Sequence, residues 1–182
     1  LWANSFKYSM PLQKAFFLPH SPILLPSIGR EHRDVLKETI ASIENVRNGI
    51  TEEKPHTIIV LSSHTAMHTP TFNLNLSPAY RPSLEEFGDL HTTRTWHPDI
   101  ELIDRIRSAG RELYDINLLS EEKLNYGIAI PLLVTTPETP LFRIVPVTFA
   151  KLPLSEMYRF GQFLYEIAAE SNKHIAIMAT GD

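Results

Sequence analysis

The chain contains no cysteine, and this absence excludes several kinds of chemistry at once. Its 182 residues can form no disulfide bond, no zinc–thiolate site, no iron–sulfur cluster and no thiol nucleophile. Disulfides belong to oxidising compartments, so a chain without cysteine fits the reducing interior of a cell. We therefore expect a cytoplasmic protein.

Long apolar runs, an excess of one charge and glycine-rich loops are also missing. No run approaches the roughly 18 apolar residues of a membrane helix, so no membrane association is expected. The formal net charge of -4 comes from 17 basic and 21 acidic residues, which argues against a nucleic-acid partner. Only seven glycines are present, and none of them forms a phosphate-binding loop.

The residues that are present predict an α/β fold. Four runs of β-branched or aliphatic residues predict buried strands: 15–18, 57–61, 143–149 and 174–180. Three segments with apolar residues at helical spacing predict helices: 30–50, 98–109 and 154–171. The apolar segment 126–134 fits a strand or a helix. We expect one domain with a central, mostly parallel or mixed sheet that has helices on both faces.

Prolines and glycines indicate where the predicted elements end. Gly49 is expected to end the first helix, and Pro98 is expected in the first turn of the second. Pro146 lies inside a predicted strand, which indicates an edge strand or a bulge because proline has no N–H for the ladder. The segment 69–95 is expected to be a long ordered loop, with a short strand near 71–76.

Two histidines stand at the ends of two predicted strands. His20 lies between two prolines, which stiffen the backbone on both sides of it. His64 comes shortly after the strand 57–61. Ligands bind beyond the carboxyl ends of parallel strands, so the two imidazoles are expected to converge there. Two imidazoles with a carboxylate suit non-haem Fe(II), although each histidine could equally be an ordinary polar loop residue.

Other candidate residues near His64 are weaker. His68 follows it by four residues, but Pro70 argues against a helix there, so His68 is kept only as a candidate pocket residue. Ser62 and Ser63 lack both a Gly-x-Ser-x-Gly elbow and an acid partner at a suitable spacing. Serine catalysis is therefore not expected.

Several longer stretches resemble one enzyme family. They include FFLPHSPILLPSIGREH, KPHTIIVLSSHT, FGDLHT, NYGIAIPLL, RIVPVTF and IAIMATGD. Over residues 14–182 the chain resembles the catalytic subunit of the class III extradiol ring-cleavage dioxygenases. Within that superfamily it is most similar to the AmmeMemoRadiSam and Memo-like group. Residues 1–13 are then expected to be an irregular lead-in or a cloning remnant.

The resemblance implies a metal centre and an aromatic substrate. Family enzymes hold Fe(II) with two histidines and a later glutamate, and the matching histidines are His20 and His64. Another divalent metal is an alternative. A catecholic substrate and O2 take the open positions, and the ring is cleaved beside a hydroxyl. Tyr126 and His68 are expected in the catalytic pocket, Tyr126 at the place where many members have the histidine of Asp-His-Gly.

The resemblance also places an acid/base histidine and the glutamate ligand after Asp182, so 14–182 is expected to lack the C-terminal part of the domain. The favoured function is an Fe(II)-dependent extradiol dioxygenase. The alternative is a non-catalytic Memo-like domain that binds a metal or a partner in the same cleft, which the tripeptide Asn125-Tyr126-Gly127 favours. A metal-dependent hydrolase is a weaker third hypothesis. The implied partner is an AMMECR1-like domain or a second copy of the chain.

Overall fold

A six-stranded sheet forms the centre of the molecule. The computed structural model describes residues 12–64, 70–149 and 152–181. The strands lie in the order β1-β8-β2-β7-β3-β5, and every neighbouring pair is parallel except β3 and β7. Their bounds are β1 Leu12–Pro19, β2 Thr57–Ser62, β3 Phe72–Asn75, β5 Ile116–Leu119, β7 Arg143–Phe149 and β8 Ile175–Gly181. The mostly parallel, mixed sheet that the sequence predicts is confirmed.

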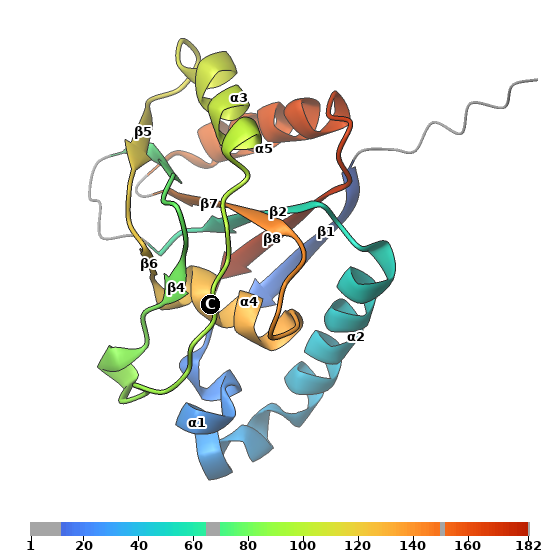
Figure 1. Ribbon diagram of the computed structural model, residues 1–182, viewed down its shortest axis with the longest axis vertical. Coiled ribbons are helices and arrows are strands. Elements are labelled where there is room, and N and C mark those ends of the chain that lie inside the picture. Colours follow the sequence, from blue (N-terminus) through green and yellow to red (C-terminus); the bar gives the residue numbers. More distant parts are fainter. Residues whose placement is uncertain (1–11, 65–69, 150–151, 182) are drawn as a thin grey trace, which may run out of the picture.

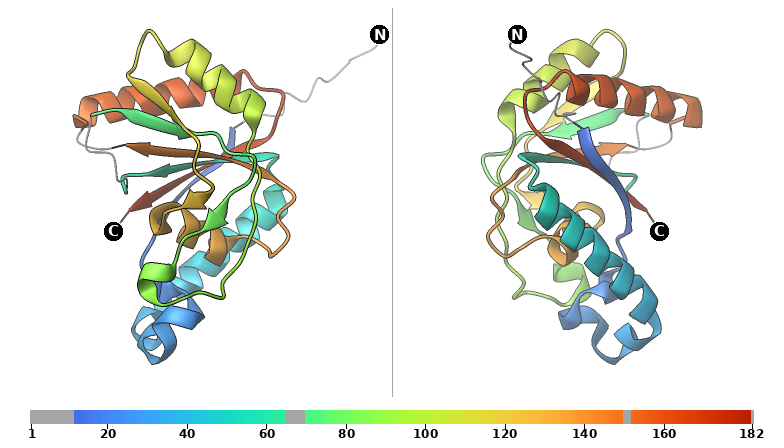
Figure 2. Two further views of the ribbon diagram at one scale, coloured as in Figure 1. Left: turned by 60° about the vertical axis from the view of Figure 1, so that its left-hand side comes forward. Right: turned by 90° about the vertical axis from the view of Figure 1, so that its right-hand side faces the viewer.

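Helices cover both faces of this sheet (Figures 1 and 2). On one face lie α2 (Lys37–Glu53) and α4 (Tyr126–Thr135), and on the other lie α3 (Ile100–Gly110) and α5 (Leu154–Ala169). The smaller elements are α1 (Pro26–Gly29), a two-stranded parallel sheet of β4 (Arg81–Pro82) and β6 (Lys123–Leu124), and 3-10 helices at Pro22–Leu24, Arg30–Leu36 and Glu85–Phe87. Within the described residues, no helix combines the length and apolar character needed to cross a membrane.

Alternation along the strands divides the apolar side chains between two cores. Val60 and Met178 belong to the core shared with α2 and α4, whereas Ile59 and Ile175 belong to the core shared with α3 and α5. All four side chains are fully buried. Strands that are buried on both faces consist of nearly continuous apolar residues, and their positions could therefore be predicted from the sequence.

The predicted limits of the first helix, 30–50, are wrong at both ends. The segment Arg30–Leu36 is 3-10 helix, and regular α-helix begins only at Lys37. The helix passes Gly49 and is capped by Lys54, which has a left-handed φ of 47° and donates its N–H to the carbonyl of Ile50 at 3.0 Å. Pro55 explains this end, because a residue before proline is disfavoured in the α conformation.

Two prolines have roles that differ from the predicted ones. Pro98 precedes α3 instead of lying in its first turn, and the helix is capped by Asp99. Pro146 lies in β7, an interior strand between β2 and β3. The pairing of β3 with β7 stops at Leu74 and Val147, next to Pro146, so the missing N–H falls where the short neighbouring strand ends.

The segment 126–134, for which the sequence predicts either a strand or a helix, forms the helix α4. The side chain of Asn125 caps it, because Oδ1 accepts a hydrogen bond from the Ile128 N–H at 3.3 Å. Eight of the ten residues of α4 are buried. A helix buried on all sides has no polar face and therefore shows no helical period in its sequence.

Candidate functional site

His20 and His64 come together beyond the carboxyl ends of β1 and β2. These strands are separated by β8, which places them about 9–10 Å apart. The two imidazoles nevertheless approach each other, and their ring centroids are 6.0 Å apart. His20 is buried, with 2% of its surface exposed, and His64 is half-buried. The structure therefore brings the two predicted site histidines to one place.

Tyr126 lies beside both histidines. It is the first residue of α4, and its ring centroid is 4.1 Å from that of His64 and 5.5 Å from that of His20. The ring of Phe87 meets the tyrosine edge-on at 5.1 Å. Tyr126 is thus a neighbour of the histidine pair, as the sequence predicts, whereas His68 lies outside the described residues.

Polar contacts of its backbone hold His64 against α4. The N–H of His64 donates to Ser62 Oγ at 3.2 Å, and its carbonyl accepts from Asn125 Nδ2 at 3.0 Å. Because Asn125 also caps α4, one side chain links the loop that carries His64 to the helix that carries Tyr126. Sequence reasoning missed Asn125 in this role, although an asparagine before an apolar segment is a typical helix-cap signal.

Gly127 allows α4 to approach the end of β2 closely. A Cβ atom at Gly127 would lie 2.6 Å from Ser62 Oγ and 2.7 Å from the Cβ of His64, which is closer than real contacts allow. The carbonyl of Gly127 accepts a hydrogen bond from Thr180 Oγ1 at 2.8 Å, so the same residue ties α4 to β8. Only glycine permits this packing.

Replacing Gly127 by alanine is expected to destabilise the fold by about 1–3 kcal/mol, because the added methyl must push α4 away from His64. Gly161→Ala is the matched control: it lies within α5, with nothing within 4 Å of a built Cβ. The control is expected to stabilise by about 0.5–1 kcal/mol through helix propensity. Urea unfolding of both variants measures the difference, and equal shifts would contradict the close approach.

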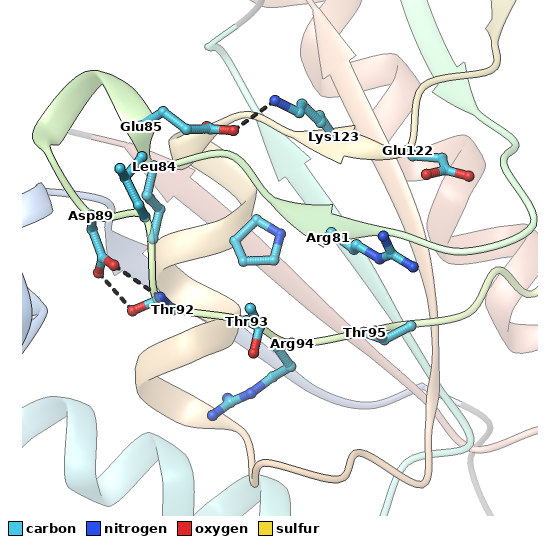
Figure 3. A pocket seen from close by; sticks show the side chains of 12 residues that line it. Arg81, Leu84, Glu85, Asp89, Thr92, Thr93, Arg94, Thr95, Glu122 and Lys123 are labelled. Atoms are coloured by element: carbon cyan, nitrogen blue, oxygen red, sulfur yellow. Dashed lines mark hydrogen bonds and ion pairs between the residues drawn. The ribbon is translucent and has the colours of Figure 1, made fainter.

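Asp89 organises the loop that places Phe87 against Tyr126. Its carboxylate accepts hydrogen bonds from the hydroxyl and the N–H of Thr92 (Figure 3). It also accepts from the hydroxyl of Ser27 and the N–H of His91. Burial acts to raise the pKa of Asp89, but these hydrogen bonds outweigh it and hold that pKa well below its ordinary value. The loop is thereby pinned to α1.

A pocket lies beside this loop and not at the histidines. It has a volume of about 540 Å³, and polar residues such as Arg81, Asp89, Thr92 and Lys123 line it (Figure 3). None of His20, His64 and Tyr126 contributes to it. It contains no concentration of one charge, because Lys123 is paired with Glu85 at 2.6 Å.

The histidine pair fits part of a metal site. With a metal–nitrogen distance of about 2.1 Å, an imidazole centroid lies roughly 3.2 Å from a bound ion. Centroids 6.0 Å apart are therefore close enough for His20 and His64 to share one ion. Within the ranges that the structure describes, no group of three histidine, aspartate or glutamate side chains could hold a metal.

Comparison with known families connects this geometry to a class of enzymes. Residues 14–182 match the family described as the catalytic LigB subunit of aromatic ring-opening dioxygenase. The chain belongs to this family. The resemblance seen in the sequence is thus confirmed for nearly the whole chain, and the family is one of aromatic ring-opening dioxygenases.

This LigB-family chain matches one curated protein at low identity. A protein of Clostridium acetobutylicum, "Protein CA_C1420", is 26% identical over 183 residues, which cover 95% of this chain and 39% of that protein. The chain thus spans about two fifths of that relative's length. Among solved structures, isoform 2 of uridine phosphorylase from Schistosoma mansoni, in complex with citrate, is 8% identical with a TM-score of 0.39 over 88% of each chain. A likeness this weak carries no functional information.

Proposed function

We propose that this chain forms the iron-binding part of an extradiol-type ring-opening dioxygenase that acts on catecholic substrates. His20 and His64 would be the metal ligands. One observation carries the proposal: in a chain of the LigB family, two imidazoles from separate parallel strands lie with their centroids 6.0 Å apart. Fe(II) is the proposed metal, and another divalent ion is the alternative.

The backbone of each histidine is held in place. His20 follows β1 between Pro19 and Pro22, is almost completely buried, and so has a rigid backbone and few rotamers. His64 is held through its backbone by Ser62 and Asn125. When bound, the ferrous ion would supply the site at which a catechol and O2 are brought together. Preorganised ligands of this kind lower the cost of binding the ion.

Tyr126 is the residue of this chain best placed to act on the substrate. Its phenol can donate or accept one hydrogen bond, and it stands beside both imidazoles. We infer that Tyr126 orients a catechol hydroxyl. We also infer that Phe87 limits the access of water to the side of the Tyr126 ring that it contacts. His68 is proposed as a further pocket residue. The resemblance assigns the acid/base histidine and the third ligand to positions after Asp182.

The order of the strands supports the assignment of His20 and His64 to one site. β8 lies between β1 and β2 and ends at Gly181, which pairs with Pro19 just before His20. The end of β8 therefore lies between the two strands that carry the histidines.

Ring opening can be tested directly. The full-length protein, which would carry the acid/base histidine and the third ligand that the resemblance implies, is loaded with Fe(II) under anaerobic conditions, mixed with simple catechols and then exposed to O2. We expect a yellow ring-opened product and the uptake of one O2 per ring, with neither seen in metal-free protein. Fe(II) binding without turnover across a panel of catechols would favour the non-catalytic, Memo-like alternative. No affinity for Fe(II) would overturn both.

The proposed setting is cytoplasmic, which the absence of cysteine supports. The proposed macromolecular partner is an AMMECR1-like domain or a second copy of the chain. Light scattering of the purified protein, alone and mixed with an AMMECR1-like domain, distinguishes these two partners.

A further inference from the structure

Two buried asparagines occupy a face of β3 where apolar residues would be expected. Phe72 and Leu74 point into the core with α3 and α5, so Asn73 and Asn75 alternate onto the opposite face, toward α4. These amides are only 1% and 7% exposed. Buried amides in a strand are informative because polar side chains are usually placed at the surface.

The amides line a small pocket beside His64. The pocket has a volume of about 120 Å³, and its polar lining includes Asn73, Asn75, Asn125 and Thr148. Asn125 Nδ2 also donates to the carbonyl of His64 at 3.0 Å. Asn125 therefore borders the pocket and contacts the main chain of His64. Counting about 30 Å³ for a water molecule, the pocket has room for a substituent of a few heavy atoms.

A row of three hydroxyls crosses the carboxyl ends of β7, β2 and β8. Thr148 and Thr180 both pair in register with Ser62. Ser62 Oγ accepts from the His64 N–H, and Thr180 Oγ1 donates to the Gly127 carbonyl. Two of the three hydroxyls thus support the histidine and α4.

Thr148 is the member of this row whose hydroxyl is not used within the described structure. Its polar contacts there are confined to its main chain, whose carbonyl accepts a weak bond from Asn73 Nδ2 at 3.4 Å. The residue is 8% exposed and lines the pocket. Among the described residues, Thr148 Oγ1 is not one of the buried side-chain atoms that lack a partner, so it is accessible to solvent. Because Thr148 lines the pocket, a ligand group there can replace water as the partner of this hydroxyl.

The charges around the pocket select a neutral partner. Lys123 is the cation among the lining residues, and Glu85 holds it at 2.6 Å. Glu121 adds a negative charge to the same lining. A carboxylate in this pocket would therefore lie near a glutamate without a free cation, which is unfavourable. A hydroxyl or a carboxamide can bond to Thr148 and Asn73 at no such cost.

We propose that this pocket binds a neutral, hydrogen-bonding substituent of the aromatic substrate. The chain would then select catechols with a hydroxymethyl- or carboxamide-type group over carboxylated catechols. The inference rests on the proposed function, because it requires that the aromatic ring binds at His20 and His64. It adds the substrate class, and it names Thr148 as a residue that determines specificity.

Binding of three kinds of ligand tests this selection. The Fe(II)-loaded protein is titrated anaerobically, by calorimetry, with catechol, with 3- and 4-(hydroxymethyl)catechol and with 3,4-dihydroxybenzoate. We expect one hydroxymethyl isomer to bind about tenfold more tightly than catechol, the gain of roughly one buried hydrogen bond. We expect 3,4-dihydroxybenzoate to bind no more tightly than catechol.

Two conservative variants connect the preference to Thr148: one is isosteric and lacks the hydroxyl, and the other is smaller and keeps it. Thr148→Val removes the hydroxyl and is expected to abolish the tenfold preference while the affinity for catechol stays unchanged. Thr148→Ser keeps the hydroxyl and is expected to keep the preference. Both should fold, because the hydroxyl makes no hydrogen bond within the described chain, and thermal unfolding verifies this.

The binding of unsubstituted catechol distinguishes a failure of the pocket proposal from a failure of the proposed function. If catechol itself does not bind to the Fe(II)-loaded protein, the proposed function fails and the selection fails with it. If catechol binds but neither hydroxymethyl isomer binds more tightly, the pocket proposal alone is overturned. It is also overturned if Thr148→Val weakens the binding of catechol and of the hydroxymethyl isomers equally.

Discussion

Alanine at either His20 or His64 is expected to weaken Fe(II) binding by more than about 100-fold, since even the partners of metal ligands typically account for 10- to 100-fold. The centroids of the two rings lie 6.0 Å apart, so each variant would leave the ion with one imidazole from this pair. The measurement is an anaerobic Fe(II) titration, repeated with Co(II) because its visible absorption reports on ligand number.

The matched control is His91→Ala. The side chain of His91 is exposed, and among the described residues its polar contact is that of its backbone N–H, which donates to Asp89. This variant should bind Fe(II) as the wild type does. Because His20 is buried, His20→Asn and thermal unfolding show whether any loss reflects misfolding. Wild-type affinity in a folded His20 or His64 variant would exclude that residue as a ligand.

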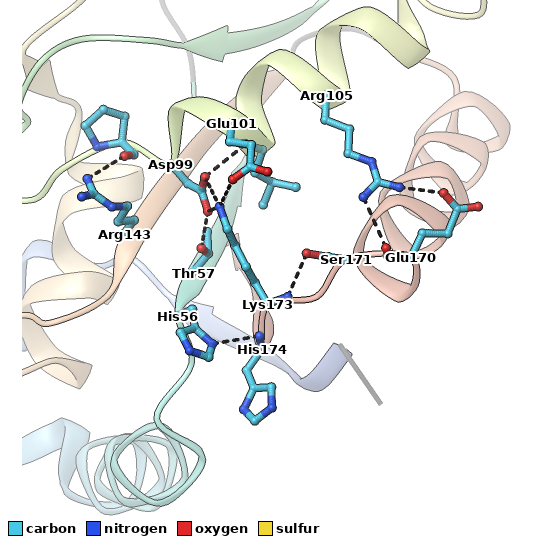
Figure 4. Close-up of polar contacts among 12 residues, drawn as sticks. His56, Thr57, Asp99, Glu101, Arg105, Arg143, Glu170, Ser171, Lys173 and His174 are labelled. Atoms are coloured by element: carbon cyan, nitrogen blue, oxygen red, sulfur yellow. Dashed lines mark hydrogen bonds and ion pairs between the residues drawn. The ribbon is translucent and has the colours of Figure 1, made fainter. Parts of the chain in front are cut away.

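Asp99→Ala is expected to lower the free energy of unfolding by about 3 kcal/mol, because it breaks a buried ion pair and removes a helix cap. Asp99 is 2% exposed and accepts hydrogen bonds from Lys173 Nζ at 2.8 Å, Thr57 Oγ1 at 2.5 Å and the Leu102 N–H at 3.1 Å (Figure 4). It therefore joins β2, α3 and the segment before β8, at the amino ends of the strands. Urea unfolding measures the effect.

Glu101→Gln is the control for Asp99→Ala. Glu101 pairs with the same lysine at 2.9 Å, but its side chain is 84% exposed. Exposed pairs contribute little, so this change should stay within about 0.5 kcal/mol. Equal losses in the two variants would contradict the assignment of Asp99 as the central partner of Lys173.

The pH dependence of stability follows from the pKa of Asp99. Burial acts to raise that pKa, but hydrogen bonds from Lys173, Thr57 and the Leu102 N–H outweigh it, so the folded pKa is lowered. Its contribution is therefore fully present above the unfolded pKa of about 3.9 and is lost as the pH falls through the folded pKa. The difference between wild type and Asp99→Ala should be constant near neutral pH and shrink below about pH 4.

Much of the sheet was predictable because its strands are buried on both faces. β2, β7 and β8 consist mainly of aliphatic and β-branched residues, a composition typical of interior strands. The limits of α2 and the nature of α4 were not predictable in the same way. The end of α2 depends on Pro55, and α4 lacks any polar face because its surroundings bury it.

The sequence by itself determined the fold class, the family and the positions of His20 and His64 at strand ends, because each of these depends on residues close together in the chain. Only the tertiary structure decided what surrounds them. Asn125 reaches His64 across 61 positions, and Thr180 reaches Gly127 across 53. Contacts between residues so far apart depend on how helices and strands pack, and no local pattern records them. For the same reason, only the tertiary structure shows that no described residue bonds to the hydroxyl of Thr148.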